Sequence, residues 1–95
     1  MNIFKFYIDK IIDILKTANK EGLIYLPENL NSINVDIPPA KFNCDISTNV
    51  AMVLSKPNNK SPIEIAETLS SLIKDNDIYI EKITIEKPGF INLKL

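Results

Sequence analysis

Between Ile3 and Lys20 the apolar residues recur every three or four positions, with charged residues between them. This spacing predicts an amphipathic α-helix, because positions three and four apart lie on one face of a helix. The expected buried stripe contains Phe4, Ile8, Ile11, Leu15 and Ala18, widened by Tyr7, Ile12 and Ile14. Gly22 is a suitable end for the helix, since glycine accepts the left-handed conformation that often follows a helix C-terminus.

Two short strands are expected in the middle of the chain. The first precedes Pro38, because apolar and polar residues alternate there; its apolar positions are Ile33, Val35 and Ile37. The second covers Lys41–Ser47, and its apolar positions are Phe42, Cys44 and Ile46. The preceding segment Leu23–Leu30 fits either a strand or an extension of the first helix, and Pro27 would end both.

Two further helices are expected between Thr48 and Lys74. The first covers Thr48–Lys56; Ser47 or Thr48 caps it, and Pro57 disfavours helical conformation at Lys56. The second begins with the motif SPIE, in which Ser61 is the N-cap, Pro62 takes the first helical position and Glu64 completes a capping box. The buried stripe of this helix is expected to contain Ile63, Ile65, Ala66, Leu69, Leu72 and Ile73.

The end of the chain predicts a β-hairpin. Isoleucines alternate in one phase before Glu81 and in the other phase after Lys82, which a β-bulge would explain; they are Ile78, Ile80, Ile83 and Ile85. Pro88-Gly89 fits the centre of a type II turn, since proline presets the first position and glycine accepts a positive φ at the second. The final strand then has two faces, one with Ile91, Leu93 and Leu95 and the other with Phe90, Asn92 and Lys94.

The order of these elements predicts a single domain over residues 1–95. One helix, two strands, a helical region in two pieces and two more strands indicate an α+β fold. We expect a two-layer sandwich: a four-stranded antiparallel sheet with helices on one face, and the opposite face open. The expected core consists of Phe4, Ile8, Ile11, Leu15, Val35, Ile37, Val50, Leu54, Ala66, Leu69, Ile83, Ile85, Ile91 and Leu93.

The composition excludes several kinds of site. The net charge is −1, whereas independent nucleic-acid-binding domains are usually strongly basic. All 11 basic residues are lysines, so bidentate guanidinium contacts with phosphate or guanine are not available. The chain has no histidine and one cysteine, which leaves no zinc cluster and no histidine-based triad. We therefore expect no catalytic residue, no cofactor and no metal site.

The cysteine count and the N-terminus favour a cytoplasmic protein. Cys44 cannot form an intramolecular disulfide, and we expect it to be a small core residue. The first ten residues lack the continuous apolar segment of a signal peptide, and no run approaches the length of a membrane span.

The side chains of Phe90, Asn92 and Lys94 form a candidate site for a nucleic-acid base on the open face of the sheet. A ring can stack on a base, an amide offers a donor and an acceptor to its edge, and a lysine can lie near a phosphate. Alternatively, Phe90 packs beside Pro88 or the sheet edge, and Asn92 is an ordinary polar strand residue. The acidic balance also fits an open face that binds another polypeptide, whereas a stand-alone enzyme is the least favoured hypothesis.

The chain resembles the N-terminal additional domain of arginyl-tRNA synthetases in three motifs that occur in the family's order. They are PPAKFNCDISTNVAMVLSK, SPIEIAETL and KPGFINLKL. The resemblance implies that Phe90 stacks on a base of the tRNA D-loop and that Asn92 contacts its edge, with Lys87 at a further contact position. We interpret the residues before the short helix as mainly structural residues that cap it: Asp45, Ser47, Thr48 and Asn49.

The same resemblance implies that the chain is one part of a longer arginine–tRNA ligase. A class I catalytic domain of the same polypeptide would follow Leu95 and use ATP to attach arginine to the tRNA. This part would position the tRNA through its D-loop. In three places the sequence departs from the family pattern: Lys87 is not the usual residue at its position, Cys44 replaces a glycine and Ile46 replaces an aromatic residue.

Overall fold

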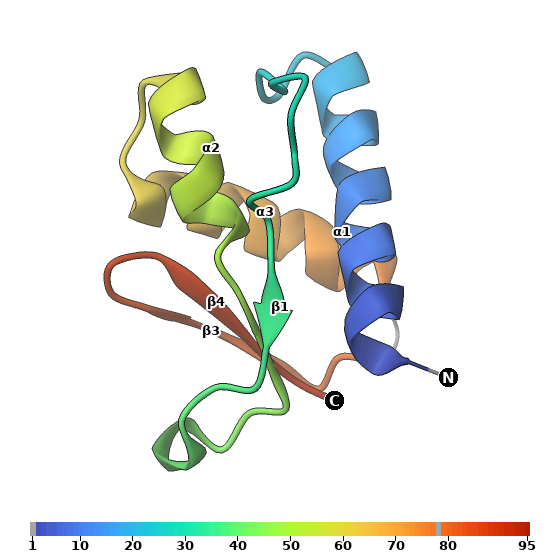
Figure 1. Cartoon of the computed structure of the whole chain (residues 1–95), viewed down its shortest axis with the longest axis vertical. Helices are drawn as coiled ribbons and strands as arrows, with labels where there is room; N and C mark the ends of the chain where they lie inside the picture. Colours follow the sequence, from blue (N-terminus) through green and yellow to red (C-terminus); the bar gives the residue numbers. More distant parts are fainter. Residues whose placement is uncertain (1, 78) are drawn as a thin grey trace.

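The structure, a computed structural model, describes residues 2–77 and 79–95. Its elements in chain order are α1 (Ile3–Lys20), β1 (Val35–Asp36), the 3-10 helix η1 (Ala40–Phe42), β2 (Ile46–Thr48), α2 (Val50–Asn58), α3 (Pro62–Asn76), β3 (Lys82–Glu86) and β4 (Phe90–Lys94). The strands form one antiparallel sheet in the order β1-β2-β4-β3. Figure 1 shows α2 and α3 above the strands, α1 alongside them at the right, and the short 3-10 turn at the lower left. This confirms the predicted α+β architecture.

The first helix begins and ends where the sequence predicts. Asn2 is its N-cap, and the side-chain oxygen accepts hydrogen bonds from two backbone N–H groups of the first turn. At the other end Gly22 has a φ of +79°, and the N–H of Leu23 donates to the carbonyl of Ala18 at 2.9 Å. This is the Schellman arrangement, which satisfies helix-end carbonyls and requires a left-handed residue. The helices of the described residues include none long and apolar enough to cross a membrane.

The segment between α1 and β2 departs from the expected strands. Leu23–Leu30 forms neither a strand nor a helix, and β1 contains two residues. The chain leaves the sheet at Pro38, because a proline has no N–H to donate to a strand ladder. The side chain of Ile37 is consequently 74% exposed, so its predicted place in the core is wrong.

The predicted strand over Lys41–Ser47 is also largely wrong. Its first residues belong to η1, whose C-cap Asn43 has the left-handed conformation with a φ of +50°. Regular strand begins at Ile46. Phe42 and Cys44 are therefore half-buried outside the core, while Ile46 alone of the three predicted positions is buried.

Helices α2 and α3 are confirmed, with shifted ends. The hydroxyl of Thr48 accepts a hydrogen bond from the N–H of Val50 at 3.2 Å, and α2 continues through Pro57 because proline in the last turn removes only one helical hydrogen bond. The predicted N-cap of α3 is present: the Ser61 hydroxyl accepts from the N–H of Glu64 at 3.2 Å and lies 3.3 Å from its carboxylate. The α3 helix ends at Asn76, two residues later than expected.

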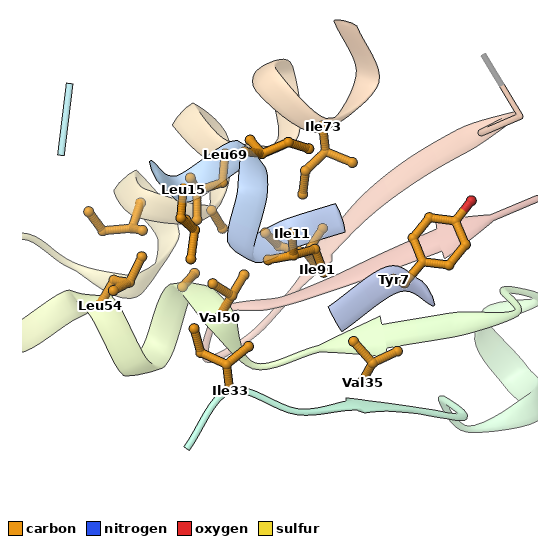
Figure 2. Packing of buried hydrophobic residues seen from close by; sticks show 14 of the residues in the cluster. Tyr7, Ile11, Leu15, Ile33, Val35, Val50, Leu54, Leu69, Ile73 and Ile91 are labelled. Atoms are coloured by element: carbon orange, nitrogen blue, oxygen red, sulfur yellow. The ribbon is translucent and has the colours of Figure 1, made fainter. Parts of the chain in front are cut away.

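The core lies between the helices and the sheet, as Figure 2 shows. Nine predicted core residues are buried: Ile11, Leu15, Val35, Val50, Leu54, Ala66, Leu69, Ile91 and Leu93. Four more are partly buried and pack against this cluster: Phe4, Ile8, Ile83 and Ile85. Other buried members include Ile24 and Ile80, which come from segments without regular structure.

The hairpin differs from the prediction in both its entry and its turn. Strand β3 begins at Lys82, so no β-bulge separates two strand segments; the predicted position Ile78 lies outside the described residues. The Lys87–Pro88 peptide bond is cis, and the N–H of Gly89 donates to the carbonyl of Glu86 at 2.9 Å. These features are those of a type VI turn, so the predicted type II turn is wrong.

Gly89 is required by packing and not by its φ angle. A Cβ atom at this position would lie 2.6 Å from Cβ of Pro62 and 3.3 Å from Cγ of Met52. The hairpin turn therefore packs directly against the start of α3 and against α2. Gly22 is the opposite case: its φ is positive, and nothing lies within 4 Å of an added Cβ atom.

We expect Gly89→Ala to lower the free energy of unfolding by about 1–3 kcal/mol, because the added methyl group overlaps Pro62. Gly22→Ala should cost about 1–2 kcal/mol through its backbone conformation alone. Urea denaturation measures both effects. Asparagine tolerates positive φ, so Gly22→Asn should be more stable than Gly22→Ala. Its side chain is larger than a methyl group, so Gly89→Asn should be less stable than Gly89→Ala. Equal stabilities of Gly89→Ala and the parent chain would contradict the packing argument.

A buried polar cluster joins α1 to the connection after α3. The hydroxyl of Tyr7 donates to Oδ2 of Asp77 at 2.8 Å, and the N–H of Tyr79 donates to Oδ1 at 2.8 Å. The Lys10 ammonium lies 3.6 Å from the same carboxylate. Burial raises the pKa of the Tyr7 phenol above its usual range, and the hydrogen bond to Asp77 raises it further.

Stability should fall as the pH rises above about 10, the pKa of an unfolded tyrosine. The unfolded chain then loses a proton that the folded chain retains on Tyr7, so ionisation favours unfolding. Urea denaturation between pH 8 and pH 11 checks this expectation by comparing the chain with Tyr7→Phe. The free energy of unfolding of Tyr7→Phe should decline less steeply with pH than that of the parent chain. Identical pH slopes would contradict the conclusion that Tyr7 keeps its proton in the folded chain.

Candidate nucleic-acid interface

A row of polar side chains crosses the sheet on the face away from the helices. In the strand register Asp36 lies opposite Ser47, Ser47 opposite Asn92, and Asn92 opposite Thr84. Successive strand residues point to opposite faces, so this row lies back to back with the buried residues Ile91 and Leu93 of β4. The predicted phase of the final strand is therefore correct.

A pocket lies over this row, and we call it the outer pocket. The segment after β1 contributes Ile37, Pro38, Pro39 and Phe42 to its lining, and the β3–β4 hairpin contributes Glu86, Lys87 and Phe90. The sheet contributes Asp36, Ser47 and Asn92. The pocket thus combines apolar and aromatic side chains with a few polar groups, as small-molecule and base-binding sites commonly do.

Asn92 is the most unusual residue of the outer pocket. Its side chain is 1% exposed, and neither Oδ1 nor Nδ2 has a hydrogen-bond partner among the described residues. The expectation that Asn92 faces solvent is therefore wrong, although the residue is on the predicted face. An amide buried without partners costs about 1–3 kcal/mol. A group of this kind marks a position where a ligand can supply the missing partners.

The other three predicted contact residues divide between two pockets. Phe90 lines the outer pocket and is 40% exposed. Lys87, in the hairpin turn, is exposed and lines the same pocket. Lys94 does not line it and lies in a neighbouring hollow with Phe42 and Lys82. The structure thus brings together Phe90, Asn92 and Lys87, and separates Lys94 from them.

Two of the residues expected to cap α2 make hydrogen bonds elsewhere in the fold. Asn49 does not cap α2 with its side chain; its amide donates to the carbonyl of Ser32 at 2.9 Å and accepts from the N–H of Asn34 at 2.7 Å. Asp45 accepts a hydrogen bond from the N–H of Leu95 at 2.8 Å. These bonds hold the segment before β1 and the end of β4 in place around the outer pocket.

Two residues of the outer pocket were given other places by the sequence: Ile37 was expected in the core, and Phe42 on the apolar side of a strand. Ile37 and Phe42 fit an alternating apolar pattern, and that pattern alone does not show which face of a sheet a residue takes. The Pro38-Pro39 pair was a usable signal, because it forces the chain out of the sheet immediately after Ile37. Cys44 was likewise expected in the core, but it is half-buried with its Sγ 3.9 Å from the Thr84 hydroxyl.

Comparison with known proteins gives a consistent result. The family model described as arginyl tRNA synthetase N terminal domain matches residues 5–95. The chain is 64% identical to an arginine–tRNA ligase of Pelagibacter ubique over 94 residues, which are 99% of this chain and 16% of that protein. It is 41% identical to the arginine–tRNA ligase of Bartonella tribocorum, over 100% of this chain and 16% of the relative. The Caldanaerobacter subterraneus ligase is 36% identical over 92% of this chain and 15% of its own length. The chain thus spans about a sixth of the length of these relatives.

We expect Asn92→Leu to raise the free energy of unfolding by about 1–3 kcal/mol, because it removes a buried amide that has no partners. Asn49→Leu is the matched control; it removes an amide with two hydrogen bonds and should lower stability by a similar amount. Urea denaturation of both variants checks this contrast. A loss of stability in Asn92→Leu would show that the amide is satisfied in the free protein.

Proposed function

The chain belongs to the arginyl tRNA synthetase N-terminal domain family, and from that premise we propose that it is the tRNA-binding N-terminal domain of an arginine–tRNA ligase. Its outer pocket binds one unpaired base of the D-loop. The catalytic domain of the same polypeptide attaches arginine to the tRNA with ATP, while this domain positions the tRNA.

The observation that carries this proposal is the Asn92 amide in the outer pocket. An amide has one acceptor oxygen and two N–H donors, and all of them lack partners among the described residues. The Watson–Crick edge of an unpaired base offers neighbouring donors and acceptors that match such a group. Pairing would remove the cost of the buried amide, so part of the binding free energy comes from satisfying it.

Phe90 supports the same proposal through its position on the same strand face. It is two residues from Asn92, on the rim of the outer pocket, and its ring is accessible. Stacking of a base on an aromatic ring contributes about 1–3 kcal/mol. A ring beside an amide therefore favours a base that has left its own stack, as bases in RNA loops do.

Binding requires a side chain of the outer pocket to move. Both polar atoms of the Asn92 amide are almost without exposed surface, so a base reaches them only after a lining group shifts. Phe42 and Phe90 are the aromatic side chains of the lining. The proposal therefore includes a side-chain rearrangement on binding, which is common at interfaces whose backbone stays fixed.

The charges around the outer pocket suit a base better than a phosphate. Asp36 and Glu86 contribute carboxylates to the lining, and Lys87 contributes an ammonium group. With a net charge of −1, the isolated chain gains little affinity from counterion release. Attachment to the rest of a ligase raises the effective concentration of the pocket near the tRNA, and most of the useful affinity comes from that.

In the ligase that carries this domain, Phe90→Ala and Asn92→Ala should each raise the KM for tRNA by roughly tenfold, the effect of losing about 1–3 kcal/mol of base binding. The KM values for ATP and arginine should not change, because these substrates bind elsewhere. Phe6→Ala is the matched control, since Phe6 is also 40% exposed but lies on α1, on the other side of the sheet. Steady-state aminoacylation kinetics measure all three variants.

An unchanged KM for tRNA in both Phe90→Ala and Asn92→Ala would contradict the proposal. Hydroxyl-radical footprinting of the tRNA gives an independent answer, with protection expected in the D-loop. Absence of protection, together with retained binding of another polypeptide, would favour a protein-interaction module that uses the same face of the sheet.

A further inference from the structure

We propose that a second hollow on the same face binds a backbone phosphate of the RNA whose base occupies the outer pocket. Phe42, Asn43, Cys44, Glu81, Lys82 and Lys94 line it, and we call it the lysine hollow. The inference rests on the proposed function for the identity of the ligand, and it assigns a phosphate contact to Lys82 together with Lys94.

Two lysines of the lysine hollow lie directly opposite each other. Lys82 of β3 is the register partner of Lys94 of β4, and like charges at opposed positions of a sheet destabilise it. The ion pairs among the described residues join Lys5 to Asp9 and Lys10 to Asp77, so neither ammonium is neutralised there. An anion placed between the two lysines would convert the repulsion into attraction.

The η1 segment places a further ammonium group against Phe42, a residue that lines the lysine hollow. Nζ of Lys41 lies 5.2 Å from the ring centroid of Phe42, and Lys41 is exposed. Phe42 itself lines both the outer pocket and the lysine hollow. The two sites therefore share one wall and are one side chain apart, a separation that a base and a neighbouring phosphate of the same strand can span.

The acidic groups divide the face into two different environments. The outer pocket has Asp36 and Glu86 against Lys87, whereas the lysine hollow has Glu81 against Lys82 and Lys94. A phosphate is therefore disfavoured in the outer pocket, where carboxylates repel it, and favoured in the lysine hollow, where ammonium groups attract it. Both effects grow stronger as the charges come closer. This difference gives the RNA one orientation, with its base in the first site and its phosphate in the second.

The test uses the ligase that carries this domain and a fluorescein-labelled RNA hairpin with the D-arm sequence of an arginine tRNA, titrated at several KCl concentrations. Lys82→Gln and Lys94→Gln should each weaken binding at low salt and reduce the slope of log K against log[KCl] by about 0.7, the value for one lost contact with single-stranded phosphate. Lys16→Gln is the matched control: it changes the net charge equally, but Lys16 is exposed on α1, on the helical side. Its slope should match that of the parent chain.

A charge change of opposite sign sharpens the test. Glu81→Gln removes the carboxylate of the lysine hollow and should strengthen binding severalfold at low salt. Glu67→Gln, an exposed position of α3, is its control and should have little effect. Slopes for Lys82→Gln and Lys94→Gln equal to that of Lys16→Gln would overturn the proposal, as would weaker binding in Glu81→Gln.

A hairpin with one abasic position in its loop separates this inference from the proposed function. If the base site and the phosphate site both exist, the abasic hairpin binds more weakly, and Lys82→Gln reduces its salt slope by the same amount. If Phe90→Ala has no effect on either hairpin while the lysine variants still reduce the slope, the base-binding proposal fails and the phosphate site stands. Circular dichroism of each variant confirms that the fold is retained.

Discussion

The burial of β4 under the helices determines how the rest of this domain is arranged. The strand lies between β2 and β3, and Ile91 and Leu93 have no exposed surface. A slip of one residue would exchange these side chains with Phe90 and Asn92 and place an amide in the core. The contact of Gly89 with Pro62 fixes the same register at the start of the strand. Packing on one face therefore determines which groups the opposite face presents.

That opposite face contains the features that do least for stability. Asn92 is buried without partners, and Lys82 and Lys94 lie opposite each other. Real proteins break the rules of stable packing mainly where function requires it. On the helical face, the buried carboxylate of Asp77 has Tyr7, Lys10 and the Tyr79 backbone as partners. Ser70 Oγ of α3 is also buried without a partner among the described residues. The Asn92 amide and the Lys82–Lys94 pair therefore support the proposed RNA-binding surface together, and an unpaired buried group alone does not.

Local signals predicted the parts of the fold that depend on local physics. Gly22 marked the end of α1 and the Ser61–Glu64 motif marked the start of α3, because caps act within one helical turn. The segment from Ile37 to Cys44 was not predictable in this way, since its apolar residues line pockets on the outer face and fit a buried strand equally well. For the site, alternation gave the face of Phe90 and Asn92. The burial of Asn92, the role of Phe42 and the Lys82–Lys94 pair depend on the register and on a folded-back loop, which one sequence does not show.

An acidic domain can bind an anionic polymer if the relevant charge is local. The net charge of −1 acts at long range, where salt at physiological concentration screens it within about 8 Å. On the proposed assignment the ligand meets Lys82 and Lys94 in the lysine hollow and Asp36 and Glu86 in the outer pocket, and Phe42 lines both. Such an arrangement adds little to the overall attraction, but it distinguishes the two ends of a nucleotide. Orientation and not affinity is then the contribution of this domain, and orientation is what a tethered domain can supply most effectively, because the tether already provides the proximity.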